Sequence, residues 1–182
     1  MREIELKVHV SDPLAVRQKL SAFMEFQGSV DKRDEYWALE LSAPAGARRQ
    51  FTFRLRTEPE GNRVTYKEKT YRDGMEVNEE IEFRLGERPG FLAFIGKMGA
   101  RLLYSKHKQG SLWRSAQGIQ AELVEVEGLG FFLEVEFLTE NSPELNVDDI
   151  RVRLTDVVHQ CGLNTKEIEP RPYSQLLGYS VS

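Results

Sequence analysis

The sequence predicts an α+β fold: an antiparallel sheet of about eight strands with helices packed outside it. Three observations predict this fold. Runs in which apolar and charged residues alternate recur along the chain, and compositions typical of tight turns separate them. Three other stretches carry apolar residues at helical spacing. No repeat or linker divides the 182 residues, so we expect residues 1–182 to form a single domain.

Eight segments have the composition of strands. In the first, MREIELKVHV, the apolar residues Ile4, Leu6 and Val8 alternate with charged ones, so the two kinds lie on opposite faces. The other predicted strands span 30–41, 51–58, 63–69, 77–85, 101–113, 120–127 and 131–138. The turn compositions are Pro44-Ala45-Gly46, Glu60-Gly61-Asn62 and Arg72-Asp73-Gly74, and they favour antiparallel hairpins.

Helical spacing predicts three helices outside the strands. Ser11-Asp12-Pro13 is typical of a helix start, and a helix of about three turns follows it. Residues 87–98 and 146–161 are the second and third helices, and Gly162 ends the third. The tail, 170–179, carries an apolar cluster of Tyr173, Leu176 and Leu177 that we expect to dock.

Composition excludes several classes of protein. Hydrophobic residues make up 40% of the chain and charged residues 30%, as in a soluble globular protein. A net charge of −4 argues against binding to duplex nucleic acid, and no apolar run is long enough to span a membrane. With Cys161 as the sole cysteine, no internal disulfide can form, which indicates a reducing, cytoplasmic setting.

Charged residues occur in doublets on one face of six predicted strands. Because side chains alternate between faces, residues two apart share a face. The sets are Glu3, Glu5 and Lys7; Arg54 and Arg56; Lys67 and Lys69; Glu80, Glu82 and Arg84; Lys106 and Lys108; and Glu134 and Glu136. One interpretation is an ordinary solvated sheet face. The repeated same-sign doublets favour another: like charges side by side are unfavourable unless a ligand neutralises them, as in the charged interior of a curled or closed sheet.

The two signs of charge suit the two halves of a metal–polyphosphate ligand. Arginine and lysine bind phosphate groups, and carboxylates bind hard divalent cations such as Mg²⁺ or Mn²⁺. No G-x-x-x-x-G-K-[ST] loop is present, and Gly128-x-Gly130 lacks the rest of a dinucleotide-binding motif. If the chain binds a nucleotide, it does so without the two common nucleotide-binding motifs.

Several motifs in order resemble the CYTH, or triphosphate tunnel metalloenzyme, superfamily. Glu3-x-Glu5-x-Lys7 resembles its ExExK signature. DEYWA, FRLR, VTYKEK, EEIEFR, KHK and VEGLGFFLEVEF resemble its later strand motifs in the same order. The tail RPYSQLL is similar to the C-terminal segment of the class IV adenylyl cyclase-like branch.

The resemblance implies an eight-stranded antiparallel tunnel, closed or nearly closed, that binds a triphosphate and Mg²⁺ or Mn²⁺. The implied metal ligands are Glu3, Glu5, Glu136 and Glu134. The implied phosphate-binding residues are Lys7, Arg54, Arg56, Lys67, Lys106 and Lys108, to which the charge pattern adds Lys69 and Arg84, with Glu80 and Glu82 as possible acidic support. One position departs from the family: Val124 stands where an Asp is common. Glu122 is on the same face and is the candidate substitute; otherwise a second metal site is weakened.

The expected activity is that of a metal-dependent enzyme on a small triphosphate. The tail favours a class IV adenylyl cyclase-like reaction, which converts ATP to cyclic AMP and pyrophosphate. The alternatives are hydrolysis of inorganic, thiamine or nucleoside triphosphate, and a sensor that binds nucleotide or polyphosphate without turnover. We expect Lys7 to act on Glu5 or on an attacking water, which makes these two the candidate catalytic residues. A homodimer is compatible with the sequence.

Overall fold

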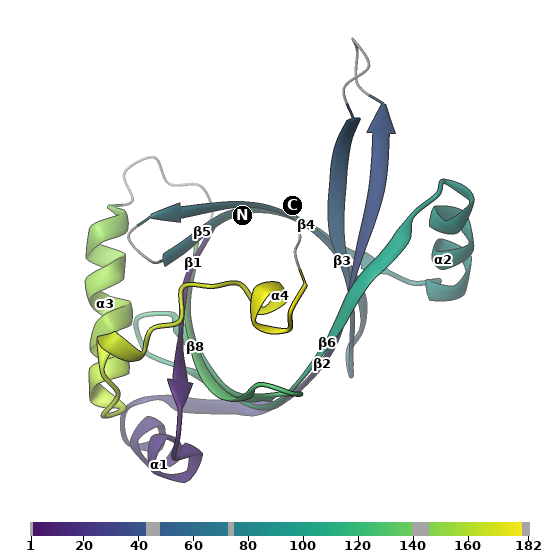
Figure 1. Cartoon of the computed structure of the whole chain (residues 1–182). Helices are drawn as coiled ribbons and strands as arrows, with labels where there is room; N and C mark the ends of the chain where they lie inside the picture. The colour runs from purple at the N-terminus through teal and green to yellow at the C-terminus, as the bar shows by residue number, and fades with distance from the viewer. Residues whose placement is uncertain (1, 43–47, 73–74, 140–145, 180–182) are drawn as a thin grey trace.

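The strands of the protein form a closed ring. The computed structural model describes residues 2–42, 48–72, 75–139 and 146–179. Every strand pairs with two neighbours, antiparallel throughout, in the order β1-β5-β4-β3-β2-β6-β7-β8, and β8 pairs with β1 to close the ring (Figure 1). The strands are β1 (Arg2–Val10), β2 (Glu25–Ser42), β3 (Arg48–Glu58), β4 (Gly61–Arg72), β5 (Met75–Leu85), β6 (Arg101–Arg114), β7 (Ile119–Val126) and β8 (Gly130–Thr139). The predicted eight-stranded antiparallel tunnel is confirmed.

Most strands begin and end close to their predicted bounds, and β2 differs most. It begins at Glu25, five residues before the predicted start at 30, because its first residues pair with the end of β6. The register shifts between Phe26 and Gly28, where Gly28 has a φ of 145°, a value that favours glycine. Pro44-Ala45-Gly46 and Asp73-Gly74 lie outside the described residues.

The three predicted helices are present as α1 (Pro13–Phe23), α2 (Arg88–Lys97) and α3 (Val147–Gln160). Asp12 caps α1 by accepting a hydrogen bond from the Ala15 backbone nitrogen at 3.0 Å. α1 and α3 pack on one side of the ring, and α2 lies on the opposite side (Figure 1). Among the described residues, no helix is long and apolar enough to span a membrane.

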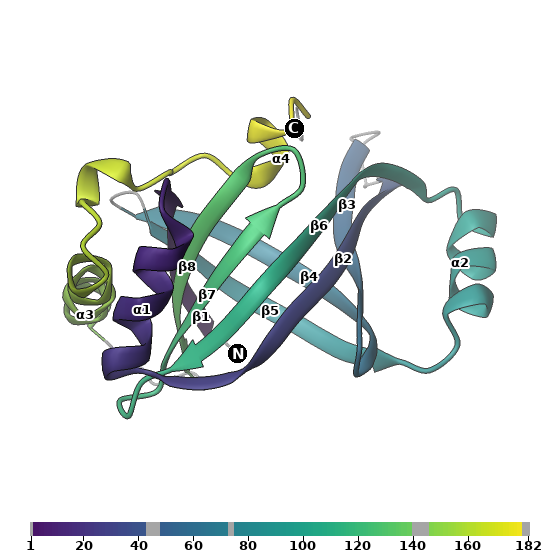
Figure 2. The ribbon, with the colours of Figure 1, turned by 90° about the horizontal axis from the view of Figure 1, so that it is seen from below.

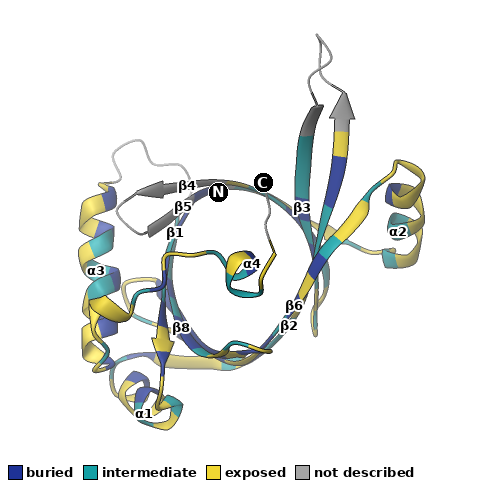
Figure 3. Cartoon of the chain, in the orientation of Figure 1, coloured by how far each residue is buried: buried dark blue, intermediate teal, exposed yellow. Residues whose placement is uncertain are grey.

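The main hydrophobic core lies outside the ring, between its wall and the helices. Ile4, Leu6 and Val8 of β1 face α1 and α3, as the alternation of the first strand predicts, and the helices turn their buried faces to the ring (Figure 3). A second cluster joins α2 to β3 and β4 through Ile95, Phe53 and other residues. The outer face of the wall is therefore apolar where helices cover it, and the charged face is left to the interior.

The C-terminal tail closes one end of the ring. The 3₁₀ helix η2 (Thr165–Glu167) is followed by a segment that docks on β1, where the Glu169 backbone nitrogen donates to the Lys7 carbonyl at 2.9 Å. The short helix α4 (Tyr173–Leu176) then lies across the opening, at one end of the ring's axis (Figures 1 and 2). Tyr173 and Leu176 pack on an interior apolar plug formed by Val30, Val124, Val126 and Phe132. The predicted docking of the tail is thus present.

Candidate functional site

The ring encloses a charged cavity of about 560 Å³, a size typical of small-molecule sites. All eight strands and the tail segment line it. Most of the site residues predicted from the sequence line this cavity: Glu3, Glu5, Lys7, Arg54, Arg56, Lys67, Glu80, Glu82, Lys106, Lys108, Glu122, Glu134 and Glu136. Arg84 is exposed opposite Arg63 and is not among the lining residues, and the side chain of Lys69 lies outside the described residues.

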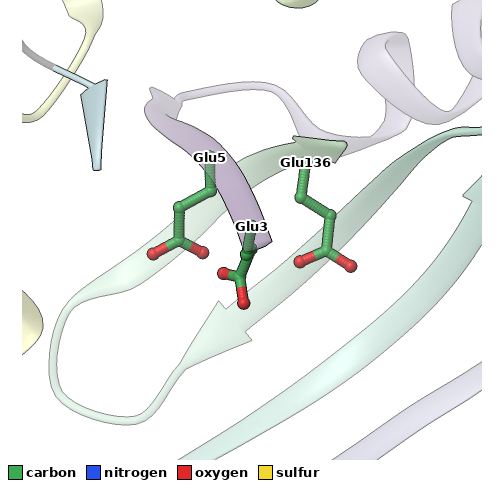
Figure 4. Close-up of side chains that lie close together, drawn as sticks. All are labelled: Glu3, Glu5 and Glu136. Carbon is green, nitrogen blue, oxygen red and sulfur yellow. The ribbon is translucent and has the colours of Figure 1, made fainter. Parts of the chain in front are cut away.

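Three carboxylates form a cluster in the cavity wall. Glu3 and Glu5 come from β1, and Glu136 comes from β8, directly opposite Glu5 in the register. One oxygen of each can be chosen so that all lie within 4.8 Å of one another, and the three side chains point to the same side of the two strands (Figure 4). We call Glu3, Glu5 and Glu136 the carboxylate cluster.

Burial and like charges raise two pKa values in the carboxylate cluster. Burial, followed by the charge of Glu5, raises the pKa of Glu3 well above its usual range. Burial, followed by the charges of Glu122 and Glu5, raises the pKa of Glu136 to about 7. Lysines act against both shifts: Lys67 Nζ lies 3.0 Å from Glu3, 3.6 Å from Glu5 and 3.1 Å from Glu80, and the charge of Lys32 lowers the pKa of Glu136. At Glu3 and Glu136 these lysines do not offset burial and the neighbouring carboxylates.

The donors of the carboxylate cluster fit a hard divalent cation. They are all carboxylate oxygens, which Mg²⁺ and Mn²⁺ prefer, and no thiol or imidazole is part of the group. The predicted ligands Glu3, Glu5 and Glu136 are therefore brought together by the pairing of the first strand with the last.

The other two predicted metal ligands are held by lysines instead. Lys108 Nζ lies 2.5 Å from Glu134 and 3.2 Å from Glu122, and Lys32 also pairs with Glu122. Burial opposes ionisation of Glu122, but Lys108 and Lys32 outweigh it and lower its pKa to about 2. Val124 packs in the apolar plug. Among the described residues, the structure brings neither Glu122 nor Glu134 into the carboxylate cluster.

Asp34 is a buried residue of the site that the sequence reasoning missed. Its side chain is fully buried and accepts two hydrogen bonds from Arg56, at 2.7 and 2.9 Å, while Lys106 Nζ lies 3.4 Å away. Burial opposes its ionisation, but Arg56 and Lys106 hold the pKa of Asp34 well below its usual range. Asp34 therefore fixes two of the predicted phosphate-binding side chains. The sequence pattern could have indicated Asp34, because Lys32, Asp34 and Tyr36 of KRDEY share one face of their strand, as the charged doublets of the other strands do.

The tail contributes Tyr173, also missed as a site residue. Its hydroxyl donates to Glu134 at 2.6 Å, and the ammonium groups of Lys106 and Lys7 lie 4.5 and 5.2 Å from its ring centroid. Burial and the Glu134 charge raise the pKa of Tyr173 well above its usual range, so the hydroxyl keeps its proton. Tyr173 thus ties α4 to the charged groups of the cavity.

Comparison with known families and structures agrees with this architecture. The family described as CYTH domain matches residues 1–173. No curated protein matches the chain. Among solved structures, the PH1012 protein from Pyrococcus horikoshii OT3 is 25% identical, with a TM-score of 0.77, and the match covers 96% of this chain and 98% of that one.

Two further structures have the same fold at lower identity. A protein described as a "putative adenylate cyclase" from Vibrio parahaemolyticus is 17% identical, with a TM-score of 0.74 and 97% of both chains covered. The Hippeastrum protein HpAC1, for which a dominant triphosphatase activity is stated, is 15% identical, with a TM-score of 0.64, and the match covers 99% of this chain and 97% of that one. These two likenesses show the fold.

Proposed function

The chain belongs to the CYTH domain family, and from this premise we propose that it is a divalent-metal-dependent enzyme that converts ATP to cyclic AMP and pyrophosphate. One observation carries the proposal: arginines and lysines converge on the same cavity as a cluster of three carboxylates, two of which have raised pKa values. Phosphoryl transfer needs such a cradle more than it needs a covalent nucleophile.

The cationic groups are suited to hold a triphosphate. Asp34 and Thr65 fix the guanidinium groups of Arg56 and Arg54, Thr65 through a hydrogen bond of 3.1 Å from Arg54. Lys106 is held against Asp34 and the Tyr173 ring. Because these side chains are already positioned, little conformational entropy is lost when they bind phosphate oxygens.

Glu3, Glu5 and Glu136 would hold the divalent cation. When bound, the cation would neutralise charge on the phosphate groups and so favour displacement at phosphorus. Glu3 and Glu5 would then have the cation as a partner in addition to Lys67, which Glu80 also holds at 3.1 Å and which lines the same cavity.

In the proposed reaction the ribose 3′-oxygen forms a bond to the α-phosphorus, and the bond from that phosphorus to the bridging oxygen of pyrophosphate breaks. The hydroxyl proton must leave. We assign its acceptance to Glu5 and the adjustment of the Glu5 pKa to Lys7, which shares its face of β1. Replacement of Lys7 by Ala should then reduce turnover strongly; unchanged turnover would remove Lys7 from the mechanism.

The C-terminal segment supports cyclisation over hydrolysis. RPYSQLL is similar to the class IV adenylyl cyclase-like branch, and its Tyr173 lies against the phosphate-binding lysines. The second candidate is triphosphate hydrolysis, which the activity stated for HpAC1, a protein of the same fold, favours. Hydrolysis would use the same cavity and differ in its nucleophile, a water in place of the ribose hydroxyl.

Product analysis separates these reactions. The protein is incubated with Mg²⁺ or Mn²⁺ and with ATP, inorganic triphosphate or thiamine triphosphate, and cyclic AMP, pyrophosphate and orthophosphate are measured. Glu3→Ala/Glu5→Ala is the inactive blank, and Glu25→Ala, an exposed change outside the cavity, is the matched control. Cyclic AMP with pyrophosphate supports the proposal, and orthophosphate alone supports hydrolysis. Binding of a triphosphate without any product would support the sensor. If the protein neither binds nor converts any of these triphosphates, the cavity is not a triphosphate site.

A further inference from the structure

Asn78 is a buried side chain for which the described residues offer no hydrogen-bond partner. It lies in β5, none of its surface is exposed, and neither its amide oxygen nor its amide nitrogen is hydrogen-bonded within the described part of the chain. Buried polar groups are nearly always paired, because an unpaired amide keeps the cost of losing water without any compensation. A leucine of similar size would avoid this cost. The unpaired amide therefore points to a partner outside the polypeptide.

The register places Asn78 beside the carboxylate cluster. β1 pairs with β5, and Asn78 lies directly opposite Glu3. Directly opposite residues of antiparallel strands point to the same face, with Cβ atoms about 4.5–5.5 Å apart. Asn78 also alternates with Glu80 and Glu82, which line the cavity, so its side chain faces inward on the side of Glu3 away from β8, although Asn78 is not itself among the lining residues. Glu136 flanks β1 from one neighbouring strand and Asn78 from the other.

We propose that the amide oxygen of Asn78 is a further ligand of the divalent cation held by Glu3, Glu5 and Glu136. The inference rests on the proposed metal dependence and assigns a residue to it that no sequence motif indicates. Amide oxygens are common ligands of hard cations alongside carboxylates. The partner that the buried amide lacks is then the cation itself.

An uncharged amide is suited to a position beside the carboxylate cluster. The carboxylate cluster already holds three acidic groups whose oxygens can lie within 4.8 Å of one another. A fourth carboxylate would add to the repulsion among them in the metal-free protein. An amide adds a coordinating oxygen without a fourth negative charge. Asn78 would thus complete the ligand set at a smaller cost to the folded protein than an aspartate.

The test is the affinity for Mn²⁺ alone, with no nucleotide present. Free Mn²⁺ is measured by electron paramagnetic resonance during titration of the wild type, Asn78→Leu and a control, Ser174→Ala. Ser174 is also buried and lines the cavity, but it lies in α4 and is hydrogen-bonded to Tyr104. We expect Asn78→Leu to weaken Mn²⁺ binding about tenfold, and Ser174→Ala to leave it unchanged.

Thermal melting distinguishes a ligand from a residue that only supports the fold. Without metal, Asn78→Leu should melt no lower than the wild type, because an unpaired amide has been replaced by an apolar group. Asn78→Asp should melt lower without metal and gain more from Mn²⁺ than the wild type does. This second variant provides the answer if Asn78→Leu does not fold.

Each outcome decides one question. If the wild type binds Mn²⁺ and Asn78→Leu binds it equally well, Asn78 is not a ligand, although the metal site stands. If Asn78→Asp gains no more from Mn²⁺ than the wild type, the amide oxygen is not within reach of the cation. If the wild type itself binds no Mn²⁺, the proposed metal dependence fails and the assignment of Asn78 fails with it.

Discussion

Two groups of glutamates in one cavity behave in opposite ways. In the carboxylate cluster the pKa of Glu136 is raised to about 7, whereas the pKa of Glu122, on the neighbouring strand β7, is lowered to about 2. Glu122 is buried and Glu136 is half-buried, so burial does not explain why Glu136 has the higher pKa. Glu122 has Lys108 and Lys32 as partners, while Glu136 faces other carboxylates and accepts a hydrogen bond from Gln120. The comparison shows that the charges around a glutamate, and not its burial alone, set its pKa in this cavity.

The largest effect should come from removing Lys108, the lysine that pairs with Glu122 and Glu134. Lys108→Met removes the lysine that pairs with both Glu122 and Glu134, and breaking a buried pair in this way costs about 3–5 kcal/mol. We expect the free energy of unfolding in urea to fall by that amount. Lys97→Met, an exposed change of the same kind at the end of α2, should change it by less than about 0.5 kcal/mol. Equal effects of the two would mean that the pairs of Lys108 contribute nothing.

The second-largest effect should be the change of stability with pH, which has opposite signs for Glu136 and Glu122. Between pH 4.5, the usual pKa of a glutamate, and about pH 7, the folded protein keeps a proton on Glu136 that the unfolded chain has lost. The stability linked to Glu136 is therefore present at low pH and is lost as the pH rises through about 7. For Glu122 the sign is reversed, and its contribution is lost only as the pH falls from 4.5 through about 2.

Thermal melting of the metal-free protein tests this difference. From pH 5 to pH 7.5 we expect the melting temperature to fall by about 5 °C, and Glu136→Gln should remove much of the fall. Glu122→Gln should leave the fall in place. Mn²⁺ should also reverse it, because the cation competes with protons for the carboxylate cluster. A melting temperature that rises across this range without metal would contradict the raised pKa of Glu136.

The smallest effect should come from the tail. Tyr173→Phe removes the hydrogen bond to Glu134 but keeps the ring beneath Lys7 and Lys106, so a loss of about 1 kcal/mol is expected in urea unfolding. Glu134 keeps Lys108, which limits the loss. If Tyr173→Phe instead destabilises the protein as much as Lys108→Met, the tail and not the lysine holds this part of the cavity together.

The faces of the strands could be predicted from the sequence, because alternation depends only on neighbours along the chain. This local periodicity predicts the charged interior and the three helices. It also predicts that Glu3 and Glu5 lie on the same face of their strand. The partners across strands could not be predicted in the same way. Which carboxylates meet a lysine depends on the non-consecutive pairings β1–β5, β2–β6 and β1–β8, and turns between successive strands do not encode these.

The missed residues have this cause in common. Asp34 meets Arg56 of the next strand but also Lys106, which comes from β6. Asn78 lies opposite Glu3 only because β5 pairs with β1. Glu122 and Glu136 are the same residue type on the same interior face, and only the order of the strands gives one lysine partners and the other carboxylate neighbours.

The ring closes where its first strand meets its last, and this has a consequence for synthesis on the ribosome. β1 emerges early and cannot complete its pairing until β8 has been made, since Glu5 lies opposite Glu136. Contacts between such distant parts of a chain form slowly. The carboxylate cluster spans this junction, so it does not exist in a nascent chain that stops before β8. A cation bound there would join the first and last strands of the sheet, so it would bind only after the ring has closed.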